Sequence, residues 1–346
     1  MEYIGIDVHK NESQICLVTD VGEIIERRIV TRHDRFAEAL GKRPRARILI
    51  EASTESEWVA RCLEELGHEV IVADPNFAPM YATRSRRVKT DRRDAQALMD
   101  ACRLGAYRGS HRTSEPQRRV RTLLTVRDNM VRTRVRQIQV LRALLRREGL
   151  RVRSGQASSF GKRMDEVESP QWLCDIITPL RAVMDSVNGE MLLVERAIEQ
   201  IVEGDPVVRR LCTAPGIGPV TAVAFVSTLD LIQRFKGAHK VEAYIGLVPS
   251  EFSSGERQQR GSITKTGNTR LRWLLVEAAW SILRSRHSRT EELRQWTQRI
   301  ALRRGQRIAV VALARRLAGI LFAMWRDETE FGCKAERRAK KEAAVA

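Results

Sequence analysis

The sequence predicts an α/β domain at the N-terminus, followed by a long helical region and a second domain that is mostly helical. Short apolar segments alternate with amphipathic ones as far as residue 104, which is typical of strands alternating with helices. An arginine-dense segment with an apolar residue at every seventh position follows, and longer apolar segments fill the last third. With 346 residues, the chain is long enough for two domains that each have a core.

The net charge indicates a polyanionic partner. The chain has 61 lysines and arginines against 43 aspartates and glutamates, which gives a formal net charge of +18. Such an excess is typical of proteins that bind nucleic acid or an anionic membrane surface. We expect no membrane span, because Arg315 and Arg316 interrupt the most apolar late stretch, 308–325, and no segment reaches the required length.

The first residues and the cysteine spacing indicate in which cellular compartment we expect the protein. The chain opens with a predicted strand rather than with a charged and then apolar leader, so we expect no signal peptide. The six cysteines are scattered and lack C-x-x-C spacing, which favours reduced thiols over a zinc site or a disulfide framework. The sequence therefore predicts a cytoplasmic protein that binds nucleic acid.

Three strands open the chain. Runs rich in apolar and β-branched residues predict strands over 2–8, 13–19 and 23–30. Asp20-Val21-Gly22 supplies the turn chemistry for a hairpin between the second and the third.

Two further strands and two helices complete this domain. A short helix is predicted near 35–40, a strand over 47–51, an amphipathic helix over 56–66 that Gly67 ends, and a fifth strand over 69–73. The order strand, strand, strand, helix, strand, helix, strand is that of a ribonuclease-H-like α/β layer.

Four carboxylates occupy positions that need a physical explanation. Asp7 lies within the first predicted strand, where an ionised group is costly unless a cation or donors compensate it, so it either binds a metal or caps the following turn. Glu51 ends the fourth strand in the same way. Asp91 and Asp94 lie on one face at the start of a helix predicted to reach about residue 103, where capping and the helix dipole would also explain them.

These four acids form one site if the sheet is ribonuclease-H-like. The first and fourth strands are then neighbours, a later helix packs across them, and the carboxylates converge. Their mutual repulsion favours hard divalent cations, Mg²⁺ or Mn²⁺. Two such ions about 4 Å apart activate a nucleophile and stabilise the leaving oxygen at a phosphodiester. The sequence therefore predicts a metal site at Asp7, Glu51, Asp91 and Asp94.

A long helix is predicted from Glu115 to about Arg153. Its apolar residues recur at every seventh position, which predicts a coiled-coil-like seam within one chain or between two. These residues are Leu124, Val131, Ile138 and Leu145. A Ser/Gly-rich linker is predicted at 154–162, and a second heptad-like helix over 187–201, ended by Asp205-Pro206, could return antiparallel against the first.

Arginines flank this seam with few acids to balance them. A run of charge is usually a solvated face. This one is so one-sided that we favour contacts with phosphates. The arginines of this helix that we expect at phosphates are Arg119, Arg127, Arg134 and Arg142.

Two segments in the last third have the composition of phosphate-binding loops. Segment 213–220 resembles the hairpin of a helix-hairpin-helix element, in which Gly216 and Gly218 let the backbone approach a phosphate, and a tight turn between core helices is the alternative. Segment 250–255 is rich in serine and glycine, which by default indicates a flexible loop, but it lies between two apolar helical segments. Basic residues follow it closely: Arg257, Arg260, Lys265, Arg270 and Arg272.

Five motifs occur in order along nearly the whole chain. They are Tyr-Ile-Gly-Ile-Asp7, Ile-Glu51-Ala, Lys-Thr-Asp91-x-x-Asp94-Ala, Pro-Gly-Ile-Gly, and Gly-Leu-x-Pro followed by Ser254-Gly255. Each is weak alone, but together they resemble the insertion-sequence 110 family of transposases, including its 1111 subgroup.

The resemblance implies an architecture and a set of partners. It implies a RuvC-like domain with a D-E-D-D metal site over 1–110, an arginine-rich coiled-coil and linker region over 111–204, and a transposase domain over 205–332. The composition of the last residues, 333–346, predicts a basic disordered tail. The resemblance also implies that Ser254 is the catalytic serine. The implied enzyme is guided by a structured bridge RNA and acts on donor and target DNA as dimers that assemble into tetramers.

The implied mechanism is strand exchange through a covalent 5′-phosphoserine link, in which Ser254 attacks a DNA phosphodiester with help from metal held by the four acids. Ser253 departs from some family patterns and is the alternative nucleophile. Two other functions fit parts of the sequence. A RuvC-like nuclease or junction resolvase would use metal-activated water, and a non-catalytic RNA- or DNA-binding scaffold would need neither the serine nor the acids.

Overall fold

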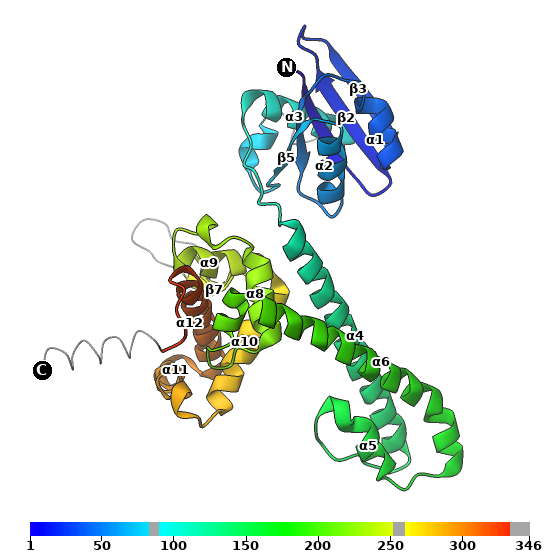
Figure 1. Ribbon diagram of the computed structural model, residues 1–346, viewed down its shortest axis with the longest axis vertical. Helices are drawn as coiled ribbons and strands as arrows, with labels where there is room; N and C mark the ends of the chain where they lie inside the picture. Colours follow the sequence, from blue (N-terminus) through cyan, green and yellow to red (C-terminus); the bar gives the residue numbers. More distant parts are fainter. Residues whose placement is uncertain (83–89, 252–259, 333–346) are drawn as a thin grey trace, which may run out of the picture. The chain divides into compact units, whose positions relative to one another are not determined.

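The computed structural model describes residues 1–82, 90–251 and 260–332. The chain divides into two compact units, Met1–Thr113 and Ser114–Ala346, and each is described by itself (Figure 1). The first unit is a mixed α/β domain and the second is mostly helical. The predicted fold class is confirmed at this level.

A five-stranded sheet forms the centre of the first unit. Its strands are β1 (Tyr3–Val8), β2 (Glu12–Val18), β3 (Ile24–Val30), β4 (Arg47–Glu51) and β5 (Glu69–Ala73). Their spatial order is β3-β2-β1-β4-β5. The first three strands pair antiparallel, whereas β1–β4 and β4–β5 pair parallel. The first and fourth strands are therefore neighbours, as predicted.

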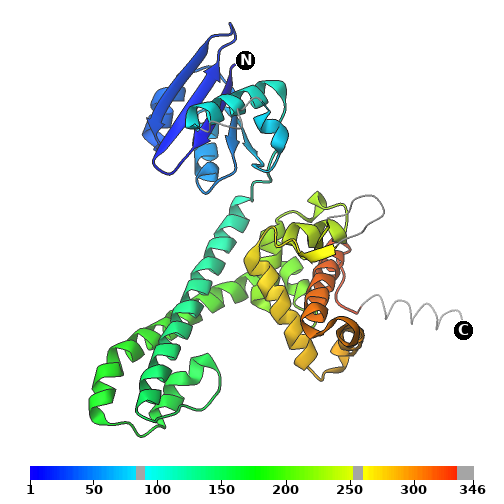
Figure 2. The ribbon, with the colours of Figure 1, turned by 180° about the vertical axis from the view of Figure 1, so that it is seen from behind.

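Helices cover both faces of this sheet (Figures 1 and 2). On one face, α1 (His33–Leu40) and α2 (Ser56–Glu65) pack against alternate apolar residues of β1 and β4. On the other face lies α3 (Asp91–Leu104), which contacts β1, β2 and β4. Because successive strand residues alternate between faces, Gly5 and Asp7 belong to the face that α3 covers.

Gly5 lets α3 lie directly on β1. A Cβ atom at this position would lie 2.2 Å from the backbone nitrogen of Met99 and 2.3 Å from the carbonyl oxygen of Ala95. Both neighbours are backbone atoms of a helix, so neither can move aside as a flexible side chain would. The contact holds the first turn of α3, which carries Asp91 and Asp94, over the sheet.

The second unit contains an antiparallel pair of long helices, α4 (Glu115–Arg147) and α6 (Gln171–Gly204). The end of α4 shares an apolar cluster with the start of α6, through Leu141 and Leu173. The start of α4 and the end of α6 instead contact the large core of the C-terminal helices. The predicted antiparallel return of a second helix is therefore confirmed.

The connection between these helices differs from the prediction. α4 ends at Arg147 rather than near residue 153, and Gly149 just beyond it has a left-handed backbone with φ +75°. The predicted linker at 154–162 is wrong where α5 (Phe160–Asp165) begins, because the Phe160 ring is buried against the end of α4. α6 begins at Gln171, well before the predicted residue 187.

The remaining helices build the largest core of the chain. They are α7 (Pro206–Leu211), α8 (Pro219–Leu229), α9 (Ala238–Ile245), α10 (Thr269–Arg284), α11 (Glu291–Arg304) and α12 (Gln306–Arg326). The short 3₁₀ helices of both units are η1 (Ala78–Tyr81), η2 (Ala157–Ser159), η3 (Ile232–Arg234) and η4 (Ser288–Thr290). Strands β6 (Pro249–Glu251) and β7 (Arg260–Ile263) pair antiparallel beside these helices.

α12 is a core helix of the second unit. With 21 residues it is long and apolar enough to cross a membrane by length and composition alone, so the prediction that no segment reaches this length was wrong. Half of its most apolar stretch is buried inside the protein. Leu313, Leu317 and Leu321 are fully buried among the other helices, which accounts for the apolar sequence.

Replacing Gly5 with alanine is expected to destabilise the first unit by about 3 kcal/mol, the upper part of the range for overpacked cores, because the new methyl group meets helix backbone. Calorimetry of the full-length protein should show a lower melting temperature for this unit. Gly109→Ala is the matched control, because nothing lies within 4 Å of a Cβ atom at Gly109. Equal melting temperatures for the two variants would contradict the proposed contact.

Candidate metal centre and nucleic-acid-binding surfaces

Asp7 is a buried carboxylate at the end of β1, with 8% of the residue exposed. Burial is the largest influence on its pKa and raises it. The charge of His9 lowers this pKa, whereas the charges of Asp94, Asp91 and Glu51 raise it. The other three acids predicted from the sequence therefore all lie close enough to act on Asp7.

Glu51 occupies the matching position on the neighbouring strand. The register pairs Ile6 of β1 with Ile50 of β4, so Asp7 and Glu51 follow at the same end of two parallel strands. The hydroxyl group of Tyr81 donates a 2.5 Å hydrogen bond to Oε2 of Glu51. This hydrogen bond fixes the orientation of the Glu51 carboxylate.

Thr90, rather than an aspartate, caps α3. Its Oγ1 accepts a hydrogen bond from the backbone nitrogen of Arg93 at 3.3 Å. Asp94 is buried, and half of the Asp91 side chain is exposed. The capping role that could have explained these aspartates is therefore filled by a neighbouring residue, although their charges still favour the helix N-terminus.

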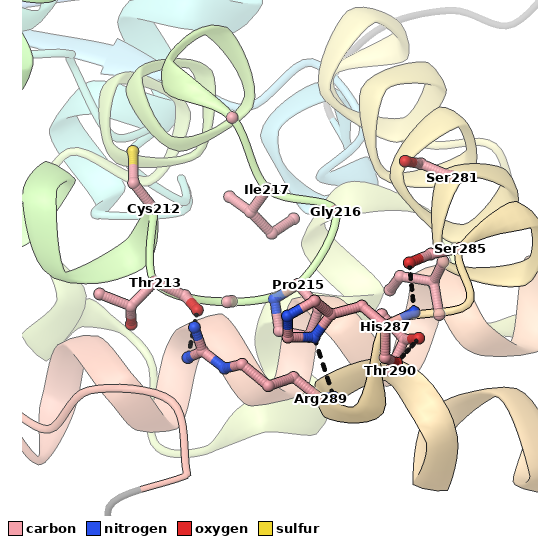
Figure 3. Close-up of a pocket in the computed structure, with 13 residues that line it drawn as sticks. Cys212, Thr213, Pro215, Gly216, Ile217, Ser281, Ser285, His287, Arg289 and Thr290 are labelled. Atoms are coloured by element: carbon pink, nitrogen blue, oxygen red, sulfur yellow. Dashed lines mark hydrogen bonds between the residues drawn. The ribbon is translucent and has the colours of Figure 1, made fainter.

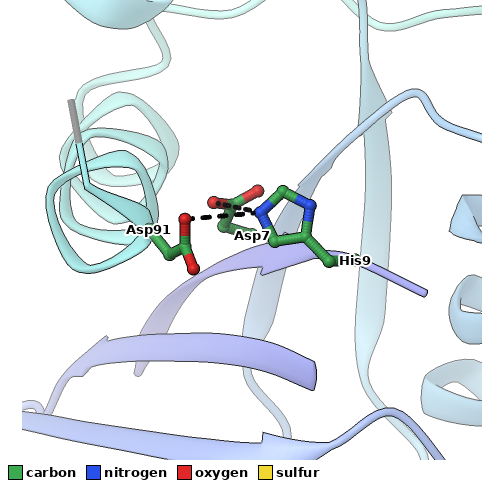
Figure 4. A group of neighbouring side chains, drawn as sticks. All are labelled: Asp7, His9 and Asp91. Atoms are coloured by element: carbon green, nitrogen blue, oxygen red, sulfur yellow. Dashed lines mark ion pairs between the residues drawn. The ribbon is translucent and has the colours of Figure 1, made fainter. Parts of the chain in front are cut away.

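His9 joins the acidic cluster, and sequence reasoning missed it. Its Nε2 lies 3.3 Å from Oδ2 of Asp7 and 3.5 Å from Oδ1 of Asp91 (Figure 4). The available signal was the spacing Asp-x-His at the end of β1, because residues two apart in an extended segment point the same way.

The donor atoms of this cluster fit a divalent cation. One ligand atom each from Asp7, His9 and Asp91 lies within 4.8 Å of the others. Carboxylate oxygens suit Mg²⁺ and Mn²⁺, and an imidazole nitrogen adds to the affinity for Mn²⁺. A cation here would offset the repulsion that raises the pKa of Asp7.

The four arginines predicted to contact phosphates have different surroundings on α4. The Arg119 side chain is exposed and pairs with Glu115 one turn earlier. The other three guanidinium groups contact side chains of the second unit: Arg127 pairs with Glu195 at 3.3 Å, Arg134 donates to Asn188 at 3.4 Å, and Arg142 lies 5.4 Å from the centre of the Phe160 ring. Phosphate contacts by these residues stay a prediction.

The two hairpin glycines between α7 and α8 have different structural roles. Gly216 has φ +74°, and a Cβ atom there would lie 2.8 Å from the carbonyl oxygen of Ala278, so the fold requires glycine. Gly218 has an extended backbone that any residue adopts, and nothing lies within 4 Å of its Cβ position. The fold itself therefore does not require glycine at position 218.

A cavity of about 480 Å³ opens beside this hairpin (Figure 3). Polar side chains from the segment after α10 line it, including His287 and Arg289. The Arg289 guanidinium donates to the carbonyl oxygen of Thr213 at 3.0 Å, and Nδ1 of His287 accepts from the Arg289 backbone at 3.1 Å. The hairpin is thus held against a cationic group.

The remaining predicted residues lie near β6 and β7 in sequence. Lys265 is exposed. Arg272 is buried and donates hydrogen bonds to the carbonyl oxygens of Ile245 and Thr266, so its guanidinium group stabilises the fold. Arg270 forms an ion pair with Asp128 of α4. Four predicted residues lie outside the described residues: Ser253, Ser254, Gly255 and Arg257.

The α/β sheet with its acidic cluster and the separate helical domain match two transposase families. Residues 4–148 match the DEDD transposase family of IS110, and residues 208–295 match the transposase IS116/IS110/IS902 family. These matches define the protein as a DNA transposase with a DEDD-type domain. More particularly, the chain belongs to the IS110/IS116/IS902 family of insertion-sequence transposases.

Relatives are similar over almost their whole length. A probable family 20 transposase of Pseudomonas aeruginosa is 29% identical over 94% of this chain and 97% of its own. The transposase of insertion sequence element IS1111A of Coxiella burnetii is 27% identical over 97% of this chain and 92% of its own. That of IS1328 from Yersinia enterocolitica is 27% identical over 95% and 98%.

Replacing Asp7 with asparagine should raise the melting temperature of the metal-free protein at neutral pH. The raised pKa of Asp7 means that its ionised form destabilises the fold there, and asparagine carries no charge. Mg²⁺ or Mn²⁺ should stabilise the unmodified chain, by about 2.7 kcal/mol at 100 times the dissociation constant. The variant should lose this shift.

Thermal unfolding in EDTA, Mg²⁺ and Mn²⁺ measures both effects. Asp100→Asn is the matched control, because Asp100 lies on α3 and pairs with Arg103 rather than with the cluster. An undiminished metal-induced shift in the Asp7 variant would contradict the assignment.

Proposed function

We propose that this transposase is an RNA-guided recombinase that exchanges DNA strands through a covalent 5′-phosphoserine intermediate. Its first unit would be a RuvC-like, ribonuclease-H-like domain that binds Mg²⁺ or Mn²⁺. The observation that supports the metal-dependent part is the group of ligand atoms from Asp7, His9 and Asp91, beside the strand end that carries Glu51. It lies on a sheet of order β3-β2-β1-β4-β5. The serine and the guide RNA rest on the motif resemblance.

The residues of the site have separate tasks in this proposal. Asp7, Glu51, Asp91 and Asp94 would hold the cation. Tyr81 orients Glu51 through its hydrogen bond. His9 lies between the carboxylates of Asp7 and Asp91 and can interact with both. The bound cation supplies positive charge that stabilises a leaving oxygen and lowers the proton affinity of an attacking hydroxyl group.

Ser254 performs the covalent chemistry. Its Oγ forms a bond to phosphorus, the bond from phosphorus to the 3′ oxygen breaks, and the serine proton ends on that oxygen. The 3′ hydroxyl of the second strand then attacks the phosphoserine and releases Ser254 with its proton restored. Glu251 and Arg260, on either side of the segment that contains Ser254, are paired across β6 and β7.

Sequence specificity would come from base pairing between a bridge RNA and the donor and target DNA. The protein would read backbone and shape through exposed arginines of α4 such as Arg119, Arg132 and Arg136. The active form would be a dimer that assembles into a tetramer in the cytoplasm.

A metal-dependent nuclease or junction resolvase is the second candidate. It is favoured by the fact that the acids and His9 all lie within the first unit, which is sufficient for activating water. In that case Ser254 would have no chemical role. A non-catalytic scaffold would instead tolerate the loss of every acid.

Replacing Ser254 with alanine should abolish a covalent protein–DNA adduct, because alanine has no nucleophilic oxygen. The protein is purified with the RNA it retains, that RNA is sequenced, and labelled donor DNA is added with Mg²⁺. Denaturing gels then show the adduct. Ser253→Ala is the matched control and should keep it, whereas Asp7→Asn should lose both cleavage and adduct.

Each other outcome favours a different function. Cleavage that persists in Ser254→Ala without a covalent adduct identifies the nuclease. Nucleic-acid binding without any cleavage, and unchanged in Asp7→Asn, identifies a scaffold. Absence of both RNA and adduct from the unmodified protein would refute the recombinase.

Replacing Gly218 with alanine should weaken DNA binding without changing the melting temperature, because Gly218 is free of packing constraints and leaves room for a phosphate. The slope of log K against log salt should stay unchanged, because the substitution removes no cationic group. Gly216→Ala is the opposite control and should lower the melting temperature. Unchanged affinity in Gly218→Ala would leave the hairpin as a turn between core helices.

A further inference from the structure

A tryptophan lies exposed on the second unit, where an ion pair joins α4 to α10. Trp273 of α10 is 49% exposed. The guanidinium carbon of Arg270, one turn earlier on the same helix, lies 4.5 Å from the centre of its ring. Arg270 in turn pairs with Asp128 of α4. One face of the indole is therefore held by a cation that is itself anchored.

The surroundings of this ring are positively charged. Burial lowers the pKa of Arg270, and the charges of Arg127 and Arg132 lower it further, against the opposing effect of Asp128. Arg127 is partly neutralised by Glu195 at 3.3 Å, whereas Arg132 is exposed. Guanidinium groups thus outnumber the carboxylates that pair with them around Arg270. One acid, Glu277, lies one turn beyond Trp273 on the same helix.

Packing does not explain an aromatic ring at this position. A core tryptophan would lose most of its exposed surface to neighbouring side chains, but half of Trp273 stays in contact with water. An Arg–Trp stack attracts the cation to the ring face and restricts the ring to one orientation. A planar ring that is exposed, oriented and surrounded by cations matches the platforms on which unpaired bases stack.

We propose that Trp273 is a stacking platform for one unpaired nucleobase of a single-stranded segment, with Arg132 at the adjoining phosphates. Arg270 is a positioning residue that holds the ring. The proposal rests on the proposed function in one respect, that the protein handles nucleic acid with unpaired segments. Such a segment would come either from the guide RNA or from a DNA strand opened during exchange, and both present the same base and phosphate chemistry.

Binding of single strands to the full-length protein tests this platform. The probes are a labelled RNA of about twelve nucleotides, its DNA equivalent, and a version of each in which the bases are replaced by abasic sites. Trp273→Leu keeps an apolar side chain but lacks the aromatic face, and it should weaken binding of the normal strands roughly 5- to 100-fold. Trp273→Phe should restore most of the affinity.

Two readouts separate stacking from a merely structural role. Abasic probes should bind the unmodified protein and Trp273→Leu equally, because no base is left to stack. Tryptophan emission should fall when a normal strand binds, and Trp273→Leu should lose that quenching. Trp172→Leu is the matched control, because Trp172 on α6 is 52% exposed, and this change should leave affinity and quenching unaltered.

The outcomes also separate this proposal from the proposed function. Equal affinity of Trp273→Leu and the unmodified protein for normal strands overturns the platform, whatever the Ser254 adduct shows. A Trp273-dependent loss with RNA alone identifies the guide as the source of the base, and a loss with DNA alone identifies the exchanged strand. Either loss supports the platform even if no phosphoserine adduct forms.

Discussion

The candidate metal site depends on a contact between two backbones, that of α3 and that of β1 at Gly5. No side chain separates the helix from the strand there, so the first turn of α3 is carried over the end of the sheet. Asp7 and Glu51 come from neighbouring strands, whereas Asp91 and Asp94 come from a helix distant in sequence. Because of this close contact, the charges of Glu51, Asp91 and Asp94 all act on the carboxylate of Asp7. A larger residue at position 5 would separate the halves of the site without removing any ligand.

Both units carry charge that the protein does not neutralise alone. In the first unit, burial and repulsion among carboxylates disfavour the ionised form of Asp7. In the second, the helix pair buries the Nε atoms of Arg127, Arg134 and Arg142 without a hydrogen-bond partner among the described residues. Each unpaired buried donor of this kind costs free energy. The acids suit a cation, whereas phosphate contacts by these arginines stay a prediction.

Local patterns predicted the strands well. The strands over 47–51 and 69–73 have the predicted bounds, because each is an apolar run whose length is that of a single strand. Asp7 and Glu51 could be predicted as site residues because an ionised side chain at the end of a buried apolar strand is costly unless a cation or hydrogen-bond donors compensate it. What depended on tertiary contacts could not be predicted: His9 follows Asp7 at the end of β1, but its contact with Asp91 forms only once α3 is packed. Likewise, a linker was expected where α5 begins, but the burial of Phe160 stabilises a short helix there. α12 is apolar because it is a core helix, which the sequence alone does not distinguish from a membrane span.

Thr90 has a consequence for how this protein can be studied in complex with its substrates. Because its side chain starts α3, the neighbouring aspartates are not needed to begin the helix. An exchange of Asp91 or Asp94 for its amide therefore leaves the helix start and the strand contact in place. Such a protein keeps the shape of the site while lacking a charge that the proposed chemistry requires. It would hold nucleic acid in an uncleaved state, long enough for the assembled complex to be imaged.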